Sequence, residues 1–100
     1  MKILNKNNII NYLKEHKKDF SEKYSIYKIG IFGSFANNNN TQNSDIDIVY
    51  ETHLKDLTLS ETFALEDELK NQFNRKIDLV NFKYMNPLIK RKAIKDIIYV

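Results

Sequence analysis

Two aspartates alternate with two isoleucines in the segment Asp45-Ile46-Asp47-Ile48. Side chains alternate between the two faces of a β-strand, so a strand here sends both carboxylates to one face and both isoleucines to the other. Two like charges side by side on a half-buried strand are unfavourable unless a cation lies between them. Hard oxygen ligands of this kind suit Mg²⁺ or Mn²⁺. The segment therefore predicts a strand with an apolar face and a face that can hold divalent metal.

Two further signals accompany this segment at wider spacing. Gly33-Ser34 precedes Asp45 with ten intervening residues, and Asp78 follows Asp47 by thirty-one residues within the apolar run Ile77-Asp78-Leu79-Val80. A glycine lets a phosphate approach the backbone, and a turn after it presents N–H groups and the serine hydroxyl to an anion. Together with a third acid on a later strand, this is the residue set for handling a nucleoside triphosphate with two divalent metals.

The length of 100 residues indicates one small domain, which we place at 1–100. The net charge is +3, and its excess is concentrated near the C-terminus. A basic end can meet phosphates or an acidic partner. Because no aromatic residue lies between Lys90 and Lys95, we interpret this cluster as a solvated helix face and expect no direct nucleic-acid binding. Its members are Lys83, Lys90, Arg91, Lys92 and Lys95.

Several classes of protein are disfavoured by what the chain lacks. It has no cysteine, so neither a disulfide framework nor a thiolate metal site is available. No apolar run approaches the roughly twenty residues that span a bilayer. His16 and His53 have no companion at metal-ligand spacing, and we interpret both as surface residues. We expect a cytoplasmic protein with no membrane partner.

Three segments show helical spacing of apolar residues, each with a boundary signal. The first helix is predicted over about 7–23, where an apolar stripe runs between lysines and acids. The second begins with a capping box and ends at an asparagine suited to a left-handed stop. The third begins with an asparagine N-cap followed by proline and carries isoleucines up to position 98. The signals are Ile9, Ile10, Leu13, Phe20 and Tyr24, then Thr58, Glu61 and Asn74, then Asn86 and Pro87.

Three strands are predicted, over Ile26–Phe32, Ser44–Tyr50 and Lys76–Asn81. The asparagine-rich stretch 37–44 between the first two has no periodicity and is predicted to be an exposed loop. The order of helices and strands predicts an α+β, two-layer fold, in which a small mixed sheet is covered on one face by helices. The acids then lie on or near the open side of the sheet.

Three segments resemble the minimal nucleotidyltransferases of the DNA polymerase β superfamily: Ile29–Ala36, Ser44–Ile48 and Arg75–Val80. The resemblance covers nearly the whole chain, in order, and it implies the polymerase β-like fold. It also implies an antitoxin that is encoded beside a helical HEPN protein, usually an RNase toxin. The activity it implies is Mg²⁺-dependent transfer of AMP from ATP to a tyrosine of that toxin, which silences the ribonuclease.

The resemblance also implies roles for the motif residues. By position, Asp45 and Asp47 would hold both metal ions, Gly33 and Ser34 would bind the triphosphate, and Asp78 would hold one metal and help deprotonate the acceptor hydroxyl. A tyrosine hydroxyl with a pKa near ~10 needs such help at neutral pH. Larger relatives that modify antibiotics carry a further domain that closes over the substrate. We expect the acceptor wall here to come from another protein.

One loop departs from the family pattern. Members often have Ala-Arg-Gly where this chain has Ala36-Asn37-Asn38, and asparagines also replace the acidic or proline residues common before Ser-Asp. A missing arginine removes positive charge near the phosphates, so it bears on rate and nucleotide affinity more than on metal binding. Asn38 can adopt a positive φ at modest cost, so the turn itself is expected to survive.

Two other functions stay open beside the enzymatic one. A nucleotidyltransferase-fold antitoxin whose chemistry has lapsed would neutralise its toxin by binding alone. A small-molecule transferase, for example of an aminoglycoside, would need no protein partner. The apolar end of the chain is either core or a partner surface; it consists of Ile94, Ile97, Ile98, Tyr99 and Val100.

Overall fold

The fold is built on a four-stranded mixed sheet with the strand order β3-β2-β1-β4. The computed structural model describes residues 4–100. Strand β1 runs antiparallel to both β2 and β4, and β2 runs parallel to β3. A parallel pair needs a crossover connection, which the helix between β2 and β3 supplies. The strands are β1 (Ile26–Phe32), β2 (Ile46–Thr52), β3 (Ile77–Asn81) and β4 (Ile98–Tyr99).

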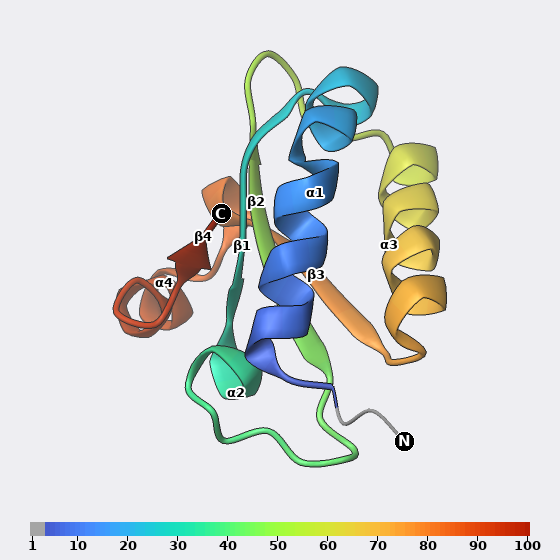
Figure 1. Ribbon diagram of the computed structural model, residues 1–100. Coiled ribbons are helices and arrows are strands. Elements are labelled where there is room, and N and C mark those ends of the chain that lie inside the picture. The colour runs from blue at the N-terminus through green and yellow to red at the C-terminus, as the bar shows by residue number, and fades with distance from the viewer. Residues whose placement is uncertain (1–3) are drawn as a thin grey trace.

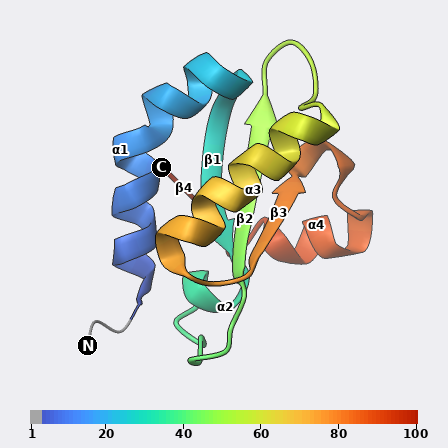
Figure 2. The ribbon, with the colours of Figure 1, turned by 90° about the vertical axis from the view of Figure 1, so that its right-hand side faces the viewer.

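The two long helices, α1 (Lys6–Tyr24) and α3 (Leu59–Phe73), cover the same face of the sheet (Figures 1 and 2). Their apolar stripes pack on the inward-facing residues of β1 and β2, and the mixed sheet under two helices confirms the predicted fold class. None of the helices within residues 4–100 is both long and apolar enough to cross a bilayer. The fully buried core residues include Ile9, Leu13, Phe20, Ile29, Ile31, Ile46, Ile48, Leu65 and Leu69.

The opposite face of the sheet carries a smaller layer that the sequence did not predict. The 3₁₀ turn η1 (Phe82–Tyr84) and the short helix α4 (Pro87–Ala93) lie on this side (Figure 1). They cover it because Val49 alternates with the isoleucines of β2 and forms a second apolar cluster with Met85 and Ala93. The prediction that helices cover only one face is therefore corrected, because the helices are divided between the two faces.

The helix boundary signals behave as predicted. The Thr58 hydroxyl accepts from the Glu61 amide at 3.1 Å, and the Glu61 carboxylate accepts from the Thr58 amide at 2.9 Å, which is a complete capping box. Asn74 ends α3 in the left-handed conformation with φ 52°. Asn86 caps α4, where its side chain accepts from the Leu88 amide at 2.9 Å and proline follows at the first helical position.

Three strand boundaries shift by one or two residues. Strand β2 runs from Ile46 to Thr52, two residues later at each end than the predicted Ser44–Tyr50, and β3 starts at Ile77, one residue after the predicted Lys76. Strand ends are set by the last backbone pairs of the ladder, which a sequence pattern does not define. The shift leaves Asp45 immediately before β2.

The prediction that the last helix continues to Ile98 is wrong. Helix α4 ends at Ala93, and Ile98–Tyr99 instead forms β4, which pairs with Gly30 and Ile31 of β1. The missing side chain of Gly30 makes this possible, because a Cβ there would collide with the backbone of the last strand. Most of the apolar end of the chain thus packs on the core, while Ile94 stays 58% exposed.

Candidate active site

The predicted glycine-serine turn lies at the end of β1. The chain passes from β1 into the one-turn helix α2 (Gly33–Ala36), and Gly33 has φ 72°, a conformation that only glycine adopts without strain. The Cα of Gly33 also lies against the Asp47 carboxylate, so that a Cβ would overlap its Oδ2 atom. Two separate constraints therefore favour glycine at position 33. The second one also places the turn directly beside Asp47.

Asp47 and Asp78 face each other across the parallel pair of β2 and β3. Burial, then the negative charge of Asp78 and a hydrogen bond to it, raises the pKa of Asp47 from 3.8 to about 6. A negative charge close to a half-buried carboxyl group disfavours its ionised form, which accounts for the direction of the shift at Asp47.

Asp45 lies beside this pair but is not part of it. Its carboxylate is 3.9 Å from the Lys76 ammonium, and its side chain is 46% exposed. Its negative charge also contributes to the raised pKa of Asp47. Across residues 4–100, no group of three or more His, Cys, Asp or Glu side chains is gathered closely enough to hold a metal. The structure therefore brings two of the three predicted acids together and leaves the third turned toward Lys76.

The chemistry of these side chains fits a divalent cation. A half-buried carboxylate beside other negative charges is stabilised when a divalent cation lies between them. All the candidate donors are oxygens, which Mg²⁺ prefers. An exposed ion pair is worth at most about 1 kcal/mol, so Asp45 can leave Lys76 at little cost and join Asp47. Asp78 is exposed, so a second molecule can reach it.

The asparagine-rich loop is exposed, as predicted, but it is tied down by a residue to which the sequence analysis gave no role. The Arg75 guanidinium donates to the carbonyl oxygens of Thr41 and Ser44, both at 3.1 Å, and it also lies 5.5 Å from the centre of the Phe35 ring. Asn38 adopts φ 59°, which confirms the predicted left-handed turn. The guanidinium binds backbone carbonyls, and no pattern of side chains marks such acceptors in the sequence.

A cavity of about 350 Å³ lies between the glycine-serine turn and α4. Gly33 and Ser34 line one side, and Lys92 and Ala93 line the other. Lys92 was predicted to be part of a solvated basic face. Its place beside the turn depends on how α4 crosses the sheet, which local sequence does not reveal.

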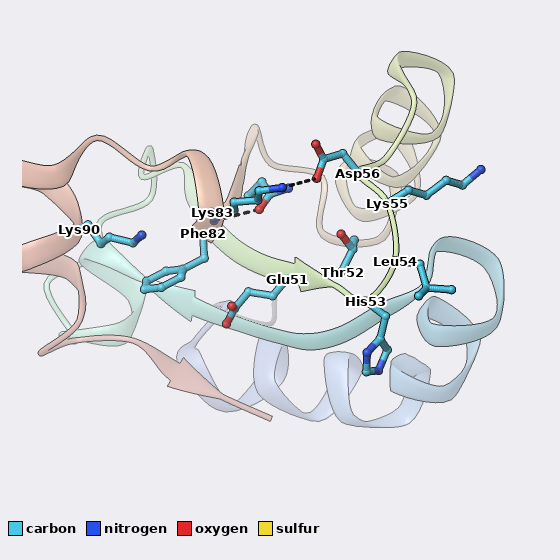
Figure 3. A pocket seen from close by; sticks show the side chains of 10 residues that line it. Glu51, Thr52, His53, Leu54, Lys55, Asp56, Phe82, Lys83 and Lys90 are labelled. Atoms are coloured by element: carbon cyan, nitrogen blue, oxygen red, sulfur yellow. Dashed lines mark hydrogen bonds and ion pairs between the residues drawn. The ribbon is translucent and has the colours of Figure 1, made fainter.

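A larger cavity, of about 570 Å³, lies away from the glycine-serine turn, and none of the predicted site residues lines it. It lies beyond the C-terminal end of β2 and is lined by Glu51, Phe82 and Lys90 among others (Figure 3). Lys90 is engaged there, since its ammonium lies 4.4 Å from the centre of the Phe82 ring. Lys83 makes a 4.0 Å ion pair with Asp56. Size alone therefore does not identify the candidate site, which is defined by the acids and the turn.

The two histidines lie away from the acids. His16 stacks on Tyr12 with 4.0 Å between ring centres, and His53 stacks on Tyr27 at 4.4 Å. His53 is exposed, as predicted, whereas His16 is partly buried on α1 because it packs between aromatic rings.

Comparison with known proteins identifies the family. The model of the nucleotidyltransferase domain matches residues 13–100. The chain belongs to this family. The resemblance inferred from the Gly-Ser turn and the three acids is thereby confirmed, and the residues that match include every one of the candidate site residues.

Relatives of this nucleotidyltransferase carry names that specify an activity. The proposed protein adenylyltransferase MJ0128 of Methanocaldococcus jannaschii is 43% identical over 93 residues, which cover 92% of this chain and 94% of the relative. The protein adenylyltransferase MntA of Thermococcus cleftensis is 27% identical over 100 residues, and the match spans the full length of both chains.

Solved structures share the fold of this nucleotidyltransferase. A toxin-antitoxin structure with AMP-PNP matches with a TM-score of 0.70 at 23% identity, covering 96% of this chain and 72% of that one. A complex of tri-AMPylated Shewanella oneidensis HEPN toxin with an MNT antitoxin matches with a TM-score of 0.67 at 18% identity, covering 94% and 70%. At these identities the matches establish the minimal nucleotidyltransferase fold.

Proposed function

We propose that this nucleotidyltransferase is the antitoxin of a HEPN/MNT pair and transfers AMP from ATP to a tyrosine of its cognate HEPN ribonuclease toxin. The observation that carries this proposal is the Asp47–Asp78 pair beside the Gly33 turn. The names of the relatives support protein adenylyltransfer, and the toxin complexes with AMP-PNP and with an AMPylated HEPN toxin support the donor and the acceptor.

In this proposal, Asp45, Asp47 and Asp78 hold two Mg²⁺ ions, with Mn²⁺ as a substitute. Such ions, when bound, offset the charge on the phosphates and stabilise the pyrophosphate leaving group. The turn at Gly33 presents its backbone to the phosphates next to the Asp47 carboxylate, and the Ser34 hydroxyl donates to a phosphate oxygen. Both residues line one cavity, which supports a shared ligand.

The tyrosine hydroxyl loses its proton to Asp78 in the proposed transfer. Its oxygen then forms a bond to the α-phosphorus, the bond from that phosphorus to the bridging oxygen breaks, and pyrophosphate leaves. A carboxylate base must be reachable by the acceptor. Asp78 is exposed on its strand, whereas Asp47 is half-buried, and this difference supports Asp78 as the group that meets the acceptor.

The direct test combines the protein with ATP, Mg²⁺ and its HEPN partner, and follows the intact mass of the partner. We expect the partner to gain mass in steps of one AMP group. Omission of Mg²⁺ and replacement of ATP by AMP serve as controls, and neither should give a mass gain. If the partner binds but gains no mass with any triphosphate or divalent metal, the catalytic proposal is wrong.

A second candidate function is neutralisation by binding alone. It is favoured by Asn37 and Asn38, which stand where members often carry arginine and glycine and leave this loop without a cation for the phosphates. The double variant Asp45→Asn with Asp47→Asn separates the two functions. Enzymatic neutralisation predicts that this variant no longer protects cells from the toxin, whereas neutralisation by binding predicts full protection.

A further inference from the structure

Helix α4 forms the second wall of the cavity that begins at the glycine-serine turn. Phe32, Gly33 and Ser34 line it from the end of β1, and Lys92 and Asp96 line it from α4 and the turn that follows. Its volume of about 350 Å³ lies within the range of small-molecule sites. The candidate phosphate turn thus shares its cavity with a lysine from the other end of the sequence.

The charge of Lys92 is committed to no ion pair or aromatic ring within residues 4–100. Within residues 4–100, the ion pairs engage Lys28, Lys76 and Lys83, but not Lys92. Lys90 lies over the Phe82 ring at the other cavity. The Lys92 side chain is exposed and lines the cavity beside Ser34, so its ammonium can meet a ligand there without breaking an existing pair.

A triphosphate bound in this cavity would need a cation nearby to offset its negative charge. The phosphate tail of a nucleoside triphosphate is strongly anionic, and it would lie beside the Asp47–Asp78 pair. Asn37 and Asn39, which line the same cavity, are neutral. Asp96 adds a further negative charge on the α4 side. Lysine binds phosphate as a compact point charge with three donors, which suits a flexible side chain at the rim of a cavity.

We propose that Lys92 binds the phosphate tail of the nucleoside triphosphate and supplies from α4 the positive charge that the loop after Ser34 lacks. This inference rests on the proposed function, since it takes the cavity beside Gly33 and Ser34 as the triphosphate site. It also gives a role to one member of the basic cluster and none to the others.

The test compares Lys92→Ala with Lys95→Ala, a matched variant that removes the same charge from an exposed lysine that does not line the cavity. Affinities for ATP and for AMP are measured by calorimetry with Mg²⁺, and thermal melts check the fold. Loss of one charge-assisted contact is worth about tenfold in affinity. We expect Lys92→Ala to weaken ATP binding about tenfold with AMP binding changed less than twofold, Lys95→Ala to match the wild type, and Lys92→Arg to retain most of the ATP affinity.

Equal ATP affinities for Lys92→Ala and Lys95→Ala would overturn this inference, and so would an equal loss of ATP and AMP binding. Transfer is measured separately from binding. If the wild type binds ATP but modifies no partner, the proposed function fails while the affinity comparison still decides the role of Lys92. If the wild type binds no triphosphate with Mg²⁺, both proposals are wrong.

Discussion

The carboxyl group of Asp47 occupies the space in which a side chain at position 33 would begin. The turn that would seat the phosphates and the strand that would hold the metal are thereby in direct contact. The positive φ of Gly33 adds a second, independent reason for glycine. These two contributions can be separated by experiment.

Replacement of Gly33 by alanine should lower the free energy of unfolding by about 2–3 kcal/mol. About 1–2 kcal/mol of this is the cost of a left-handed alanine, and the remainder is displacement of the Asp47 carboxylate. Urea denaturation in the wild-type and Asp47→Ala backgrounds measures the two parts, because only the second disappears when the carboxylate is removed. The same cost in both backgrounds would mean that the contact with Asp47 has no energetic effect.

Asp47→Asn should move stability and activity in opposite directions. The asparagine amide can donate to Asp78 without the like-charge repulsion, so we expect a gain of about 0.5–1 kcal/mol at pH 7 in the metal-free protein, an amount already discounted for partial exposure. If both metals depend on this ligand, transfer of AMP should fall by several orders of magnitude. Melting in EDTA and turnover assays measure both effects, with Asp67→Asn, an exposed residue of α3, as the control. A clear destabilisation would show that the acid is structural.

The pH dependence of stability should carry the signature of the acid pair. The raised pKa of Asp47 means that the folded state holds its proton more tightly than the unfolded chain. The stabilising contribution of this group is therefore fully present below about pH 3.8 and is lost as the pH rises through about 6. We expect wild-type stability in EDTA to fall relative to Asp47→Asn over this window, by less than about 1 kcal/mol after discounting for exposure. Saturating Mg²⁺ should abolish the difference, and parallel pH profiles would contradict the prediction.

Gly30→Ala should detach the last strand. A Cβ at this position would overlap the Ile98 carbonyl and come within 2.8 Å of the Tyr99 Cα, so β4 must move away from β1. We expect a loss of about 1–3 kcal/mol and faster amide exchange at Val100, whose N–H donates to the Ile29 carbonyl at 3.0 Å. Amides in the middle of α1 should keep their protection and serve as the internal reference. Unchanged exchange at Val100 would show that the strand tolerates the methyl group.

Much of the fold was predictable because its signals are local. Strand β1 has the predicted bounds, since a run of β-forming residues ends at a glycine that must turn. The Thr58–Glu61 capping box and the Asn74 stop were also predicted, because each depends on residues within one turn of helix. The alternation of acids with isoleucines was enough to place Asp47 on the face opposite the buried Ile46 and Ile48.

The features that escaped prediction depend on contacts between distant segments. The isoleucines after Ala93 suit a helix as well as a strand, and β4 can pair with β1 because Gly30 has no side chain. The ion pair of Asp45 with Lys76 is not visible from the spacing of the acids. The position of Lys92 beside Ser34 depends on the path of α4, which local sequence does not determine.

The anchoring of the asparagine-rich loop by Arg75 has a consequence for how this segment can diverge. The guanidinium donates to two main-chain oxygens, those of Thr41 and Ser44. These hydrogen bonds therefore do not depend on which side chains the loop carries. Mutations in the asparagine run outside Asn38, which has a positive φ, therefore leave these two hydrogen bonds in place as long as the ring of Phe35 and the arginine persist. Substitutions in that stretch, including the replacement of the arginine common in the family, would not change the distance between the Gly33-Ser34 turn and β2.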